Sequence, residues 1–268
     1  MNLFKRILAI IGLCLAFGAA VAYFVFAAWL DHQHAHKQVC QRIEVVITDS
    51  LDYGFIQKKD VLGRLLSLPE PVIGQSVRAI DLHQIEQMLE QQGAIHVANA
   101  SVNRSGILTV SISQRNPIVR IMTGQGSFYV DQSNFFFPWS NQFTAYVPVV
   151  SGHIPLHLEK DFRGKVSGQD AEWTNQLLEL VHYISQRPFW RSQIQQIHVE
   201  ENGELLLFTR VGDQLIRFGT MENLDTKFRK LSTFYDQIVP VEGWNQYAEV
   251  DLRFRNQIVC TKKEQKKK

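Results

Sequence analysis

The chain opens with an uninterrupted apolar stretch, Ile7 to Leu30, and this feature limits its fold more than any other. The stretch holds 24 residues without a charged, Asn or Gln side chain. As a helix it would be about 36 Å long, enough to cross a hydrocarbon core of about 30 Å. Lys5 and Arg6 precede it, and positive residues tend to stay in the cytoplasm. We therefore expect a cytoplasmic tail (1–6), a single transmembrane helix (7–30) and everything after it on the outer side.

A cleaved signal peptide is the alternative explanation of this stretch. The segment Val25-Phe26-Ala27 offers a possible cleavage site. The apolar region is, however, longer than the roughly 7–15 residues of a signal peptide. No second apolar run of comparable length follows, so we expect the chain to cross the membrane once.

The residues after the stretch have an ordinary globular composition and suit one large or two modest domains. The net charge of +2 gives no sign of a nucleic-acid groove. A polar linker (31–38) comes first, and a Lys-rich tail (262–268), which we expect to be disordered, comes last. His32, His34 and His36 alternate in the linker, but no carboxylate or Cys completes a metal site, and we expect neither metal nor cofactor.

Three cysteines are few for a chain that lies mostly outside the cytoplasm. Cys14 falls in the apolar stretch, whereas Cys40 and Cys260 lie at opposite ends of the folded region. The last two could pair, which sequence cannot decide, because pairing requires their Cα atoms to be close. Without a CxxC motif, we expect both to be unpaired and packed.

The first folded part, 39–115, has a β-α-α-β-β pattern. Residues 39–47 alternate as a strand, and apolar residues at helical spacing follow between Phe55 and Leu66. Asp81 is placed to cap a second helix, which Gly93 ends. Two strands, 95–103 and 107–114, are joined by a turn at Ser105-Gly106.

The second part, 116–261, is predicted to be rich in strands with flanking helices, so the fold class is α+β. Pro117 marks a bend or edge at its start. A helix capped by Asp170 is expected to end before Pro188, and another begins near Leu224. Short strands are predicted at 118–122, 127–130 and 146–150. The last third is interpreted as a meander, with predicted strands at 194–200, 205–211, 215–218, 248–254 and 257–261.

Motifs for catalysis are missing from the chain. There is no GxSxG, no Gly-rich phosphate loop and no HExxH. Asp251 and Arg253 could form an active-site pair, although side chains two apart on a strand more often form a structural ion pair. We therefore expect no enzyme and no small-molecule substrate. Binding is favoured, because a final strand at a sheet edge can recruit a strand from another chain, unless the nearby charges only protect it from aggregation.

These segments together resemble the FtsQ/DivIB family of bacterial cell-division proteins. The resemblance runs over about residues 1–262, and no single motif carries it. The matching segments, in chain order, are Ile80-Asp81-Leu82 with Ile85-Glu86, Gln114-Arg115-Asn116-Pro117, Tyr129-Val130-Asp131, Glu249-Val250-Asp251-Leu252-Arg253-Phe254 and Gln257-Ile258-Val259.

The resemblance implies a POTRA domain at 39–115, a β domain at 116–261 and a non-enzymatic role. Such a protein would sit in the inner membrane at the division septum, with its domains in the periplasm. It would link early and late division proteins and bind FtsB-like and FtsL-like partners. Carried over by position, the partner-binding residues would be Arg253, Phe254, Asn256, Gln257 and Val259. The alternatives are a POTRA-containing chaperone of envelope assembly, which usually has several POTRA units, and a membrane-anchored envelope enzyme.

Overall fold

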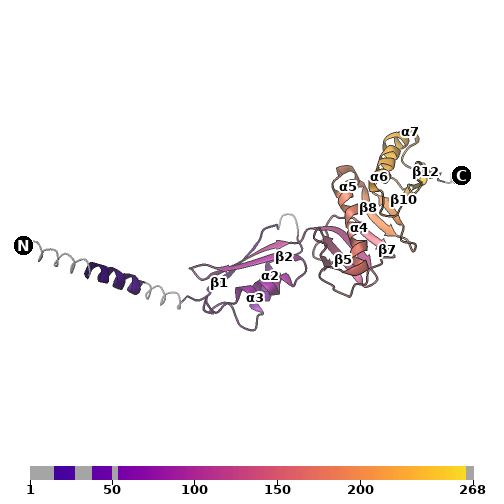
Figure 1. Ribbon diagram of the computed structural model, residues 1–268. Coiled ribbons are helices and arrows are strands. Elements are labelled where there is room, and N and C mark those ends of the chain that lie inside the picture. The colour runs from indigo at the N-terminus through magenta and orange to yellow at the C-terminus, as the bar shows by residue number, and fades with distance from the viewer. Residues whose placement is uncertain (1–14, 28–37, 50–53, 264–268) are drawn as a thin grey trace, which may run out of the picture. The chain divides into compact units, whose positions relative to one another are not determined.

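The computed structural model describes residues 15–27, 38–49 and 54–263, and they form two compact units after an N-terminal helix (Figure 1). The predicted transmembrane helix is described only over 15–27, which are helical; its remaining residues, like Cys14 and the linker histidines, lie outside the described part. Among the described residues, no helix is both long and apolar enough to span a membrane. The span at 7–30 therefore stays a prediction.

The first unit contains a three-stranded sheet in the order β1-β3-β2. Strand β1 (Arg42–Ile47) runs parallel to β3 (Ile107–Gln114), and β2 (Ile95–Val102) lies on the other side of β3. Helices α2 (Lys58–Leu66) and α3 (Leu82–Glu90) lie on one side of this sheet (Figure 1). The order along the chain is the predicted β-α-α-β-β.

Local sequence explains why this unit forms. Asp81 Oδ1 accepts the Gln84 amide hydrogen at 2.9 Å, so the predicted N-terminal cap of α3 is confirmed. Along β3, Leu108, Val110 and Ile112 are fully buried, as a period of two on a half-buried strand requires. Glu86 joins helix to sheet by accepting the Ala100 amide hydrogen at 2.7 Å.

The second unit is built on a nine-stranded mixed sheet in the order β12-β11-β10-β9-β8-β7-β4-β5-β6. Neighbouring pairs are antiparallel except β4·β7, β7·β8 and β10·β11, which are parallel. Its strands are β4 (Pro117–Thr123), β5 (Gly126–Asp131), β6 (Phe136–Pro138), β7 (Val149–Gly152), β8 (Ile194–Val199), β9 (Leu205–Thr209), β10 (Leu215–Gly219), β11 (Tyr247–Asp251) and β12 (Val259–Lys262).

Helices from two regions of the chain share one core with this sheet. Leu177 and Leu180 of α4 (Gly168–Ser185) and Phe228 and Leu231 of α6 (Leu224–Thr233) pack in the same buried cluster as residues of the strands. The shorter helix α5 (Pro188–Gln193) adds Trp190. After α6 the chain makes a π-helical turn, η1 (Phe234–Ile238), and the short α7 (Val239–Glu242).

Several predicted features of this unit are wrong. The last third is not a meander, because β10 and β11 are parallel and α6 connects them. Asp170 does not cap α4: the helix begins at Gly168, and the Asp170 carboxylate instead accepts the His157 amide hydrogen at 3.0 Å. The strand predicted at 146–150 begins later, at Val149, and β12 extends through Lys262, where the predicted tail begins.

Candidate partner-binding edge

Strand β12 forms one edge of the nine-stranded sheet, because β11 is its only neighbour among the described strands. The two strands are antiparallel, with Asp251 opposite Val259 and Val250 opposite Cys260. An edge strand exposes unpaired backbone groups along its outer side. The structure therefore supplies the strand order on which the edge interpretation depends.

The predicted partner-binding residues lie together at the start of this edge. Arg253, Phe254, Asn256 and Gln257 belong to the connection between β11 and β12, and Val259 is the first residue of β12. Arg253, Phe254 and Gln257 therefore lie outside the strands in which they were predicted, whereas Asn256 was predicted between those strands and lies there. Two of the five are exposed apolar side chains: Phe254 is 45% and Val259 39% accessible to solvent.

The strand predicted at 248–254 ends early because Asp251 turns the chain. Its Oδ1 accepts the Arg253 amide hydrogen at 3.0 Å, which competes with continuation of the strand. Leu252 remains fully buried behind this turn. The motif that reads as one strand in the sequence is thus a strand followed by an anchored turn.

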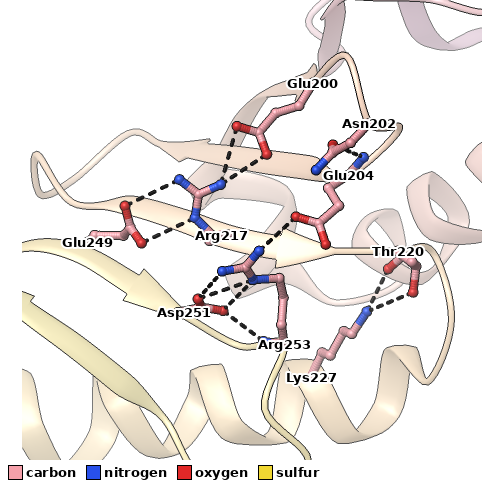
Figure 2. Close-up of polar contacts among 9 residues, drawn as sticks. All are labelled: Glu200, Asn202, Glu204, Arg217, Thr220, Lys227, Glu249, Asp251 and Arg253. Carbon is pink, nitrogen blue, oxygen red and sulfur yellow. Dashed lines mark hydrogen bonds and ion pairs between the residues drawn. The ribbon is translucent and has the colours of Figure 1, made fainter.

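Arg253 is engaged within its own chain (Figure 2). Its guanidinium donates to Asp251 Oδ2 at 2.6 Å and to Glu204 Oε2 at 2.9 Å. The hydrogen bond that Arg253 donates to Asp251, with a further one that it donates to Glu204, raises the pKa of Arg253. Burial works to raise the pKa of Asp251, but hydrogen bonds from Arg253 outweigh it and hold that pKa below its ordinary value. The Asp251–Arg253 pair considered as an active site is therefore a structural ion pair.

A second arginine is held in the same way on the neighbouring strands. Arg217 of β10 donates to Glu200 at 2.9 Å and to Glu249 at 3.2 Å (Figure 2). Its pKa is raised chiefly by the hydrogen bond to Glu249. The carboxylates of Glu200, Glu204, Glu249 and Asp251 thus surround the two guanidinium groups, and acidic side chains outnumber basic ones in this cluster.

Sequence reasoning missed the basic hollow beside the edge. A cavity of about 540 Å³ is lined by α6 and by the β11–β12 connection, and no carboxylate lines it. Its five cations are Lys227, Arg229, Lys230, Arg253 and Arg255. Burial lowers the pKa of both Lys227 and Lys230. The i, i+3 spacing of these two lysines, which places both on one face of α6, is the signal that sequence offered.

Metal ligation and thiol chemistry are the remaining questions for the part of the chain that the structure describes. No group of three or more His, Cys, Asp or Glu side chains in the described ranges is placed to hold a metal ion. Cys40 is buried and Cys260 half-buried, and both are free thiols. The arrangement at β12 is suited to holding another chain.

Two family models match the chain and together cover both units. The model of the POTRA-like domain matches residues 38–113. The model described as FtsQ/DivIB, C-terminal related, matches residues 116–261, which is more than half of the chain.

The chain belongs to the FtsQ/DivIB family.

The two matches confirm the family resemblance noted in the sequence. FtsQ/DivIB proteins are a family of non-enzymatic proteins of bacterial cell division. The α+β fold, with a POTRA-like unit followed by a β-rich sheet, is confirmed as well. A search of curated proteins returned no match.

Proposed function

We propose that this FtsQ/DivIB protein is a membrane-anchored assembly protein, without enzymatic activity, that binds FtsB-like and FtsL-like partners through the edge strand β12. The observation that carries the proposal is the position of β12 at the end of the sheet, next to the exposed Phe254 and Val259. Protein chains that add a strand to such an edge gain affinity from backbone hydrogen bonds and selectivity from side-chain pockets.

The side chains next to the edge allow an estimate of how much partner-binding free energy this site contributes. Phe254 would act as an aromatic anchor, and truncating such an anchor typically costs about 2 kcal/mol or more of binding free energy. Val259 begins β12, where an added strand would lie alongside it. A charge at this position would have to be desolvated in the complex, which opposes binding.

The predicted helix at 7–30 supplies the proposed anchor. With Lys5 and Arg6 on the cytoplasmic side, both folded units would face the periplasm. Partners with a single membrane span would then meet β12 outside the cytoplasm, at the division septum. In this role the protein would link early division proteins to late ones, and the POTRA-like unit would serve recruitment.

Partner affinity tests this proposal directly. Phe254→Ala and Val259→Asp should each weaken binding of the periplasmic part of the FtsB-like partner by about 30-fold or more, which corresponds to about 2 kcal/mol. Titration calorimetry with the full chain in detergent would measure this. Their thermal unfolding should stay close to wild type, because both side chains are exposed.

Phe208→Ala is the matched control for these variants. Phe208 lies on β9, away from the edge, and is 40% accessible, close to the value for Phe254. Its truncation should leave partner affinity unchanged. Wild-type affinity in both edge variants, or an equal loss in the control, would contradict binding at β12.

A further inference from the structure

The connection between β11 and β12 is held in place by a lysine from helix α6. Lys230 Nζ donates hydrogen bonds to two backbone carbonyl oxygens of this connection, that of Leu252 and, at 2.7 Å, that of Phe254. The two carbonyls flank Arg253, so one ammonium group fixes the backbone on both sides of that residue. A hydrogen bond from a charged donor is stronger than one between neutral groups.

The side chain of Arg253 fixes the same connection to the sheet. It reaches Glu204, the residue just before strand β9, at 2.9 Å (Figure 2). Gly219 at the end of β10 makes room for it: a Cβ there would lie 2.8 Å from Arg253 Cγ, and its φ of +76° also disfavours other residues. The turn is therefore tied to α6 by its backbone and to β9 by its side chain.

These contacts use polar groups that would otherwise be available to a partner. Arg253 already has two carboxylate partners, and Lys230 already has two carbonyl partners. Phe254 takes part in these contacts only through its backbone carbonyl oxygen, and it is exposed to solvent. The contacts thus restrain the backbone while leaving the apolar side chain outside.

We infer that Lys230 and Glu204 are positioning residues that hold the connection between β11 and β12 (252–258) in the conformation in which Phe254 and the β12 edge can receive a partner strand. This inference rests on the proposed function. A connection that is already ordered loses less conformational entropy on binding than a mobile one. Removing either residue should therefore weaken binding without removing a contact to the partner.

A competing explanation is that Lys230 only adds positive charge to the basic hollow. Arg229→Met separates the two explanations, because Arg229 lies next to Lys230 on α6, lines the same hollow and is exposed. Lys230→Met and Arg229→Met remove the same charge from adjacent positions. Only Lys230→Met removes the hydrogen bonds to the connection.

Amide hydrogen exchange of the protein without any partner reports the restraint directly. In Lys230→Met and Glu204→Gln, exchange of the segment 253–257 should become at least about fivefold faster, with β9 and β10 unchanged. Arg229→Met should exchange as wild type does. Unchanged exchange in both positioning variants would overturn the inference, whatever the partner does.

Partner affinity, measured on the same variants, completes the test. The FtsB-like periplasmic segment should bind Lys230→Met and Glu204→Gln about tenfold more weakly, and Arg229→Met with wild-type affinity. If exchange is faster and Phe254→Ala weakens binding, but Lys230→Met binds normally, the positioning role is wrong and the proposed function stands. If Phe254→Ala and Val259→Asp also bind normally, the proposed function itself fails, and the positioning role with it.

Discussion

Arg115 and Asp131 come from two separate sequence motifs, and in the structure they bond to each other at 2.8 Å. Their side chains are only 10% and 8% exposed. Arg115 also donates to the Gly93 carbonyl oxygen at 2.8 Å and lies 3.5 Å from the centre of the Phe135 ring. Asp131 further accepts a hydrogen bond from the Ser133 hydroxyl at 2.6 Å. A buried ion pair with its remaining polar groups satisfied is costly to break from one side.

The pH dependence of stability should reveal this pair. Burial works to raise the pKa of Asp131, but hydrogen bonds from Ser133 and Arg115 outweigh it, so the folded-state pKa lies below the ordinary value of 3.8. The unfolded carboxylate therefore binds a proton first as the pH falls. The stabilisation is complete well above 3.8 and is lost as the pH drops through that value toward the lower folded-state pKa.

Asp131→Asn should lower the free energy of unfolding at pH 7 by about 3 kcal/mol, because it leaves Arg115 buried without its counter-charge. It should also flatten the acid part of the stability curve. Urea unfolding at several pH values measures both effects. The control is Asp213→Asn, since the Asp213 side chain is 77% exposed and should contribute almost nothing. An Asp131→Asn protein as stable as wild type at pH 7 would show that the pair is not important for folding.

Helix α6 connects β10 to β11 and so determines where the closing strands lie. Leu231 on this helix is fully buried in the shared core. Leu231→Ala should lower the free energy of unfolding by about 3 kcal/mol, through lost burial and the cavity that remains. Calorimetric unfolding checks this against Val241→Ala, whose side chain is 82% exposed and should have little effect. Equal, small effects of the two variants would argue against α6 as a core element.

At the scale of single elements, sequence patterns predicted the features that depend on neighbouring residues in the chain, such as strand alternation and helix caps. The alternation of Leu108, Val110 and Ile112 predicted β3, and Asp81 predicted the start of α3. The parallel pairing of β10 with β11 was not predicted, because a strand–helix–strand segment does not state which strands become neighbours. The early end of β11 was missed as well, since buried Leu252 continues the apolar pattern past the turn.

At the candidate site, too, some residues were predicted from the sequence and others were not. The sequence placed Phe254 and Val259 near the edge, and the structure brings them to it. Lys230 and Glu204 were not predicted, because their contacts with the β11–β12 connection join residues 22 to 49 positions apart in the chain. Such contacts follow from the sheet order and the crossover helix, which local spacing does not determine.

At the scale of the whole molecule, the chain combines a predicted anchor, a POTRA-like unit and a sheet in which β12 is one of the described edge strands. The last two are described by the structure and matched by family models. Membrane insertion and assembly at the septum are proposals, and they would explain why the edge strand binds a partner. Strand addition fits this arrangement, because a protein held near the membrane meets other anchored proteins at a high effective concentration.

Site-specific photocrosslinking in dividing cells tests the central claim most directly. A photoreactive amino acid would replace Val259 in the edge strand and, as the control, Phe208 on β9, where the side chain is similarly exposed. If partners bind at β12, position 259 should give an adduct with an FtsB-like division protein and position 208 should give none. No adduct from position 259, or the same adduct from both positions, would contradict partner binding at β12.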